Sequence, residues 1–324
     1  LAGTADCGPA ERRPHRMSIA EKIMAAPLRA ADRLDMRAVL ILIACCACWG
    51  VNQVAIKIAN EGISPILQVG ARSLLSGVLV FVWSAARGIR LFERDGTLWP
   101  GIACGLLFGL EFVIIYVGLG FTTASRGIVF LYLAPFVVAF GAHWLIPGDR
   151  LTVTKLLGLV AAMLGLIVAM SEGLSAPGRP TLTGDVLCLL AAVLWGATTV
   201  LIRVTSLKSA APEKTLLYQL AVSGIMLPPV SYLAGEPGIV DLSLQVLLAF
   251  AYTFIVVAFV SYIAWFWLVR NYSPTRVTAF TFLSPVFGVL AGNLMLGEVF
   301  TPSLAAALAL VAFGIYLVNR PQRH

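Results

Sequence analysis

Charged residues are scarce in this chain of 324 residues. Asp, Glu, Lys and Arg together make up 12% of it, 59% of the residues are hydrophobic, and the mean hydropathy is +0.91. Soluble globular proteins average about 25% charged and roughly 45–50% apolar residues. So much apolar surface excludes a soluble fold and indicates a chain that lies mostly within lipid.

Residues that carry out chemistry are also few. The chain has three histidines, His15, His143 and His324, and it contains no H-E-x-x-H motif, no G-x-S-x-G motif and no acidic pair of the kind that binds magnesium. A phosphate-binding loop for ATP is missing as well. We therefore predict that the protein is not an enzyme and does not hydrolyse ATP.

The six cysteines do not predict a disulfide framework or a metal site, because a zinc site needs converging ligands with a polar second shell. They are spread over the tail and three apolar runs: Cys7, Cys45, Cys46, Cys48, Cys104 and Cys188. Their small size suits helix packing. We expect no metal and no cofactor.

Apolar runs follow one another along the chain with short gaps. A transmembrane helix needs about 20 mostly apolar residues, and unalternating runs of this length exclude a β-barrel. The pattern therefore predicts an all-α integral membrane protein. Its ten transmembrane helices are expected at about 38–58, 64–85, 98–120, 125–146, 153–170, 184–205, 213–234, 244–268, 275–296 and 303–319.

The basic residues give the orientation of these helices, because short cytoplasmic loops gather Lys and Arg. With the N-terminus inside, 19 of the 23 basic residues lie on the cytoplasmic side, and only Lys57, Arg126 and Arg179 lie outside. Both termini are then cytoplasmic. The net charge of +7 comes from this bias and not from a nucleic-acid surface. Residues 1–37 are expected to form a disordered tail or an amphipathic helix on the inner leaflet.

The chain also repeats itself. Trp49-Gly50 returns as Trp195-Gly196, and Leu133-Ala134-Pro135 returns as Leu283-Ser284-Pro285, with an offset between 146 and 150. The repeats are assigned to 38–175 and 181–320. Because each holds five helices, an odd number, the second must enter the membrane from the opposite side. Pro135 and Pro285 are expected to bend equivalent helices and shape a central cavity.

Two charged residues lie inside predicted spans, where charge is costly and marks function by default. From the helical rise, Arg72 lies roughly 12 Å and Glu111 roughly 13 Å below the outer surface, on consecutive helices. An ion pair is sterically plausible, and one reading is that it only fixes packing. The other reading is that Arg72 binds an anionic group, or that Glu111 titrates during transport. The second half carries Gln219 and Ser261 at these positions.

Aromatic and amide side chains supply further candidates for a pocket wall. Trp49 and Trp195 each fall about 16 Å into their helices, near the midplane, where Trp is unusual. Asn52 and Gln53 follow one turn later, with Thr198 and Thr199 in the second half. Core packing is the competing interpretation. The remaining aromatic candidates are Tyr116, Tyr132, Tyr262, Trp265 and Phe282.

These features together resemble the drug/metabolite transporter superfamily, and specifically EamA-type exporters with two EamA repeats. The resemblance is carried by the W-G pairs at 49–50 and 195–196, the run RGIVFLYLAP at 126–135, and the endings GDRLT at 148–152 and GEVFT at 297–301. It implies a ten-helix inverted-repeat fold in the inner membrane with a pocket between the halves. Asp149 stands where the family usually has Glu.

We therefore predict a secondary transporter that exports small amphipathic metabolites, such as amino acids or drugs, by alternating access. The alternative is a nucleotide-sugar or organic-phosphate exchanger, although the predicted pocket holds only one basic residue. The expected partners are a small-molecule substrate and the lipid bilayer, no nucleic acid, and, as an option left open, a second copy in a homodimer. The predicted substrate-binding residues are Trp49, Asn52, Gln53, Arg72, Glu111, Tyr116, Tyr132, Trp195, Thr199, Tyr262 and Phe282.

Overall fold

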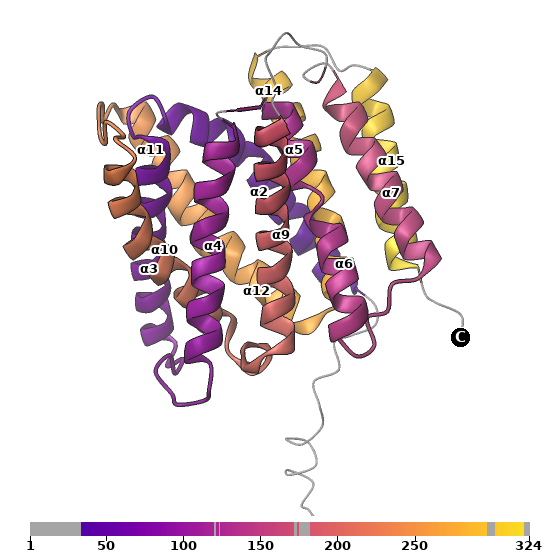
Figure 1. The fold of residues 1–324 in the computed structure, drawn as a ribbon, viewed down its shortest axis with the longest axis horizontal. Helices are drawn as coiled ribbons and strands as arrows, with labels where there is room; N and C mark the ends of the chain where they lie inside the picture. Colours follow the sequence, from indigo (N-terminus) through magenta and orange to yellow (C-terminus); the bar gives the residue numbers. More distant parts are fainter. Residues whose placement is uncertain are drawn as a thin grey trace, which may run out of the picture.

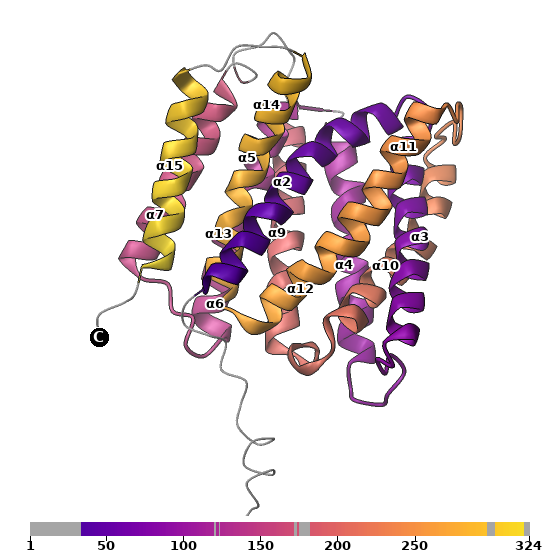
Figure 2. The same ribbon diagram turned by 180° about the vertical axis from the view of Figure 1, so that it is seen from behind.

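The computed structural model describes residues 34–119, 121–122, 124–171, 174, 182–296 and 302–320, and the predicted tail up to residue 33 lies outside this range. The described part is a helical bundle (Figures 1 and 2). Its ten helical segments are α2 (Met36–Ala59), α3 (Pro65–Ala86), α4 (Leu98–Leu119), α5 with α6 (Ala124–Leu131, Ala134–Leu145), α7 (Val153–Ala169), α9 (Leu182–Val204), α10 (Pro212–Leu233), α11 with η2 and α12 (Leu244–Tyr252, Thr253–Ser261, Tyr262–Asn271), α13 with η3 and α14 (Pro274–Ala279, Phe280–Phe282, Leu283–Leu296), and α15 (Pro302–Asn319). Seven segments are long and apolar enough to cross a membrane. The all-α integral membrane fold is confirmed.

Local sequence fixes where these helices begin. Asp35 caps α2 by accepting the backbone N–H of Ala38 at 2.8 Å, and Thr152 caps α7 by accepting that of Lys155 at 3.4 Å. A proline stands in the first turn of α3, α10 and α13, where its missing N–H costs nothing. The apolar runs between these signals then form continuous helices.

Equivalent helices of the two repeats pack against each other in opposite directions. A Cβ added to Gly70 of α3 would meet Pro228 of α10, and one added to Gly77 would approach Leu220, so α3 and α10 are antiparallel. The helices α7 and α15 cross in the same way and lie side by side in both views (Figures 1 and 2). Because helices in corresponding places run antiparallel, the two halves are related by inversion.

A glycine stripe on α4 provides another close helix contact. Side chains added at Gly101, Gly105 and Gly109 would collide with the α10 residues Tyr218, Val222 and Met226, respectively. The stripe serves helix packing, because only glycine lets the two helices come this close.

Three segments depart from a continuous α-helix. The fourth segment breaks between α5 and α6, immediately before Pro135, and the equivalent segment tightens into the 3-10 turn η3 before Pro285. Both prolines, which were expected to bend their helices, stand in the first turn of the helix that follows each interruption. The segment α11 to α12 contains a π-helical stretch, η2, whereas its counterpart α4 is a regular α-helix. Stretches of π-helix occur frequently at functional sites.

The bundle has two distinct ends. We call the end at which α2 begins and α9 finishes the lower end, as it is drawn in Figure 1, and the opposite one the upper end. The lower end carries the loops 87–97, 146–152 and 205–211, and the upper end carries 60–64 and 234–243.

Candidate functional site

A cavity of about 570 Å³ lies between the two halves. Its walls come from α2 and α4 of the first repeat and from α9 and the η2–α12 segment of the second, together with residues from the two interrupted segments. At the upper end its lining includes Asn60, Leu119 and Met170, which lie at the ends of α2, α4 and α7. In the opposite direction its lining includes Ile202 of α9 and Phe266 of α12. The cavity therefore extends toward the upper end.

The structure brings nine of the eleven predicted residues onto this wall. They are Trp49, Asn52, Gln53, Glu111, Tyr116, Tyr132, Trp195, Thr199 and Tyr262. Their proximity to a cavity agrees with the sequence reasoning, and substrate binding by them stays a prediction.

Arg72 and Phe282 are placed outside the lining. Arg72 is 3% exposed, and its guanidinium carbon lies 5.1 Å from the ring centroid of Phe112, a residue that does line the cavity. Phe282 is fully buried, with its ring centroid 6.1 Å from that of Tyr132, which lines the cavity. The sequence predicted the depth of Arg72 along its helix, but not which face of the helix it occupies.

Aromatic rings hold one another in place on the wall. Trp49 donates its indole N–H to Ser261 Oγ at 2.8 Å and meets Trp265 edge-on at a centroid distance of 5.2 Å. Trp195 meets Tyr132 in the same manner at 5.8 Å. These contacts give both midplane tryptophans a firm orientation, so the wall presents rigid apolar surfaces to a ligand.

The polar groups on the wall are few. Glu111 is the only charged residue among the described lining residues. Asn52 is 7% and Gln219 1% exposed, and neither Asn52 Oδ1 nor Gln219 Nε2 has a hydrogen-bond partner in the structure. Buried polar atoms are normally paired, so these two are available to a ligand or to water.

Several lining residues escaped the predicted set. Phe108 and Phe112 lie one turn apart on α4 on either side of Glu111, and Gln219 comes from the second repeat. Trp265, which was an aromatic candidate for the wall, lines the cavity as well. The aromatic pair spaced by four residues around a buried carboxylate was a usable signal. Gln219 was seen only as the counterpart of Arg72, and nothing in the sequence directs its amide to the cavity.

The predicted pair of Arg72 and Glu111 is not a direct ion pair. No salt bridge joins them in the described structure, and Arg72 Nε and Nη2 are buried without hydrogen-bond partners. The two charges still interact electrostatically, as Arg72 also does with Tyr116 and Tyr262. Arg72 and Glu111 therefore lie at a similar depth on neighbouring helices and interact electrostatically, but they form no salt bridge.

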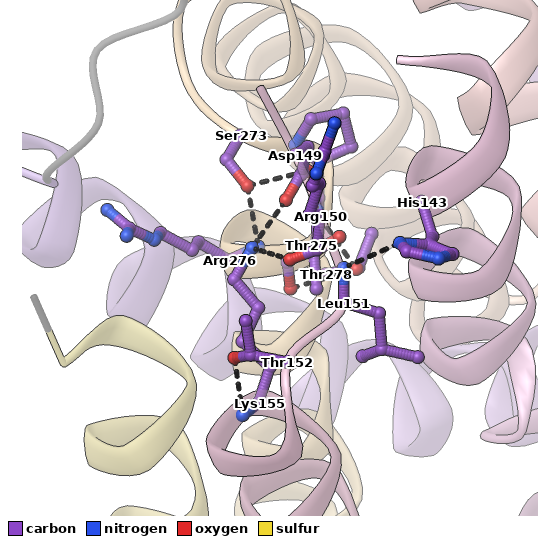
Figure 3. A network of polar contacts seen from close by, with 11 residues as sticks. His143, Asp149, Arg150, Leu151, Thr152, Lys155, Ser273, Thr275, Arg276 and Thr278 are labelled. Atoms are coloured by element: carbon purple, nitrogen blue, oxygen red, sulfur yellow. Dashed lines mark hydrogen bonds and ion pairs between the residues drawn. The ribbon is translucent and has the colours of Figure 1, made fainter. Parts of the chain in front are cut away.

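A polar network joins the two halves at the lower end (Figure 3). Asp149, on the loop before α7, accepts hydrogen bonds from Lys155 Nζ at 2.7 Å, from Ser273 Oγ at 2.7 Å and from the backbone N–H of Thr275 at 3.2 Å. The side chains of Asp149 and Lys155 are 4% and 6% exposed. Through Asp149, the first-repeat motif GDRLT is hydrogen-bonded to the start of α13 in the second repeat. We call these four residues the lower network.

Electrostatics favour the charged form of Asp149. Burial alone would raise its pKa, but the charge of Lys155 and the hydrogen bonds that the carboxylate accepts outweigh burial, so the pKa is lowered. The lower network is therefore held by an ionised carboxylate.

His143 supports the same loop. Its Nδ1 accepts the backbone N–H of Leu151 at 3.2 Å (Figure 3). This contact gives the histidine a structural role at the end of α6.

A second bridge between the halves lies at the upper end. Asp185, in the first turn of α9, accepts hydrogen bonds from Thr122 Oγ1 at 2.8 Å and from Arg126 Nε at 3.3 Å, and it also pairs with Arg126 Nη2. Arg126 belongs to α5 of the first repeat. Arg126 is adjacent in sequence to Gly127 of the cavity wall, so this bridge lies next to the wall.

An all-helical membrane bundle of two inverted halves around a central cavity is the architecture of a membrane transporter. The chain matches the EamA-like transporter family twice, over residues 36–171 and 182–320, and it belongs to that family.

Named relatives and a solved structure agree with this assignment. A probable amino-acid metabolite efflux pump of Salmonella typhimurium is 24% identical over 280 residues, which cover 83% of this chain and 90% of that protein. An Escherichia coli K12 protein named uncharacterized inner membrane transporter YedA is 28% identical, covering 84% and 87%. One solved crystal structure has a TM-score of 0.76 at 18% identity and covers 88% of this chain and 96% of that one, which shows a shared fold.

Proposed function

We propose that this protein is a secondary transporter that exports small amphipathic metabolites, amino acids or related compounds, across the inner membrane. The observation that carries the proposal is the cavity of about 570 Å³ between two inverted halves, walled by aromatic rings and reaching one end of the bundle. Ligand sites are typically concave, mostly apolar and furnished with a few polar groups, and this cavity has that composition.

Alternating access follows from the inverted halves. In the described conformation the cavity extends to the upper end, and the lower network binds the two halves together at the other end. If the halves exchange conformations, the lower contacts open and the upper end closes around the same site. With both termini cytoplasmic, as the distribution of basic residues predicts, the described conformation faces outward.

An organic phosphate is a poorer substrate for this cavity. Holding phosphate charge calls for several Lys or Arg side chains. The described lining residues include none, and Arg72 is buried against the ring of Phe112. The composition of the wall therefore favours an amphipathic metabolite over the nucleotide-sugar or organic-phosphate alternative.

The proposal is tested by flux of a panel of amino acids and aromatic compounds into proteoliposomes. Trp49→Ala and Trp195→Ala each enlarge the cavity and are expected to change the order in which the substrates move. Phe313→Ala is the matched control, because Phe313 is 53% exposed on α15 and does not line the cavity. Flux indistinguishable from that of empty liposomes would contradict the proposal. An unchanged order of substrates in both Trp variants would show that the two tryptophans do not line the substrate site.

A further inference from the structure

Glu111 is the only charged residue among the described residues that line the cavity. It lies on α4 between Phe108 and Phe112, and it makes no hydrogen bond or ion pair within the described structure. A carboxylate in a mostly apolar cavity is costly unless an opposite charge or hydrogen-bond donors meet it. Its oxygens are therefore available to a positively charged partner that enters with the substrate.

The groups that line the cavity with Glu111 suit an ammonium ion. Asn52 Oδ1, on the same wall, is a buried acceptor without a donor. Phe108 meets Phe112 at a centroid distance of 5.0 Å and Tyr262 at 6.3 Å, so the carboxylate is flanked by aromatic rings. Carboxylates, carbonyl oxygens and aromatic faces all attract a cation.

Arg72 explains how this carboxylate is tolerated while it remains open to a ligand. The guanidinium is buried, its carbon lies 5.1 Å from the ring centroid of Phe112, and it interacts electrostatically with Glu111 without a salt bridge. Its attraction lowers the cost of a charged Glu111, and the absence of a salt bridge leaves the oxygens unoccupied. Because Arg72 does not line the cavity, it is not placed to receive a substrate carboxylate.

We propose that the cavity selects its substrates by a protonated amino group that binds Glu111, while the apolar body of the substrate lies against the rings of the wall. Arg72 is then a positioning residue for Glu111 and not a binding residue for anions. This inference rests on the proposed transport function and names its substrate class as amphipathic amines, with amino acids held by their ammonium end.

The test compares probes that share one aromatic body and differ in charge: 2-phenylethylamine, 2-phenylethanol and 3-phenylpropionate. Binding to the purified full chain is followed by the fluorescence of the wall tryptophans Trp49, Trp195 and Trp265. We expect the amine to bind at least about tenfold more tightly than the alcohol, equivalent to roughly 1.4 kcal/mol, and the carboxylate more weakly than either.

Variants separate Glu111 from Arg72. Glu111→Gln is expected to lower amine affinity to that of the alcohol while alcohol binding, which also reports intact folding, stays within about twofold. Glu111→Asp keeps the charge and should retain part of the amine preference. Arg72→Gln introduces the residue of the equivalent position, Gln219, and removes a charge that favours ionised Glu111, so it should weaken the preference for the amine over the alcohol without abolishing it.

Other outcomes overturn the inference. If 3-phenylpropionate bound more tightly than the amine, and Arg72→Gln abolished that binding, Arg72 would be a binding residue for anions. An amine preference that survives Glu111→Gln would place the cation elsewhere. If the wild-type protein binds and transports the alcohol and the amine equally, the transport proposal stands and the amine site fails, whereas a protein that neither binds nor moves any probe contradicts both.

Discussion

At the scale of single residues, Asp149 makes the most consequential contacts outside the cavity. Its carboxylate is buried, pairs with Lys155 and receives two hydrogen bonds from the second repeat. Breaking a buried pair by removing one partner is strongly destabilising, because the remaining charge loses its compensation.

Asp149→Asn should therefore lower the free energy of unfolding by up to about 3 kcal/mol, measured as the apparent unfolding temperature in detergent. Since the pKa of Asp149 is lowered in the folded protein, its stabilisation is present above the unfolded value of about 3.9 and is lost as the pH falls through the folded value. The difference between variant and wild type should stay constant from pH 7 to about pH 5. Glu93→Gln, in a pair whose side chains are 81% and 50% exposed, is the control and should change little. A difference that vanishes already at pH 6 would contradict the lowered pKa.

The residue scale also shows what sequence reasoning could reach in the site. Composition and helical rise predicted the depth of Arg72 and Glu111 and the interior placement of both tryptophans. They could not predict that Phe112 lies over Arg72 or that Gln219 lines the cavity, because side-chain direction depends on how α3, α4 and α10 rotate against one another. That rotation is set by tertiary packing, for which one sequence carries no direct signal.

At the scale of helices, glycine positions decide which pairs lie in close contact. A Cβ added to Gly158 of α7 would lie 2.7 Å from the backbone oxygen of Gly314 on α15, whereas one added to Gly77 of α3 would meet only Leu220, at 3.7 Å. The first contact cannot be relieved by a side-chain movement, and the second is an ordinary van der Waals distance.

Gly158→Ala is accordingly expected to separate α7 from α15 and to cost about 1–3 kcal/mol, seen as a lower unfolding temperature. Gly77→Ala gains helix propensity without a clash, so it should be neutral or slightly stabilising. Equal effects of the two alanines would mean that the crossing of α7 and α15 is looser than described.

The breaks within helices were only partly predictable. Pro135 and Pro285 indicated where their segments depart from a regular α-helix, because proline removes a backbone hydrogen bond. The π-helical stretch of Thr253–Ser261 carries no such marker. Apart from Thr253 and Ser261 at its ends its sequence is apolar, so neither periodicity nor a breaker distinguishes it from α4.

At the scale of the whole molecule, the fold was largely predictable. The duplication with an offset of 146 to 150 and the odd number of spans in each half imply inverted repeats, and the antiparallel contacts of α3 with α10 show them. Sequence could not predict which end of the bundle the cavity reaches, because both conformations of an alternating transporter use the same sequence.

The lower network and the cavity mouth lie at opposite ends, and that arrangement underlies the proposed mechanism. Transport requires the lower network to separate, so a covalent link across it should trap the protein. Asp149 Oδ2 and Ser273 Oγ are 2.7 Å apart, which places the two side chains close enough for a short cross-link.

The decisive measurement is substrate flux in proteoliposomes for the double variant Asp149→Cys with Ser273→Cys, in a background without the native cysteines. We predict flux in the reduced protein, loss of flux on cross-linking with ligand quenching of the wall tryptophans retained, and recovery with dithiothreitol. The two single-cysteine variants should be insensitive to the cross-linker. Full flux through a completely cross-linked protein would contradict alternating access through the lower end.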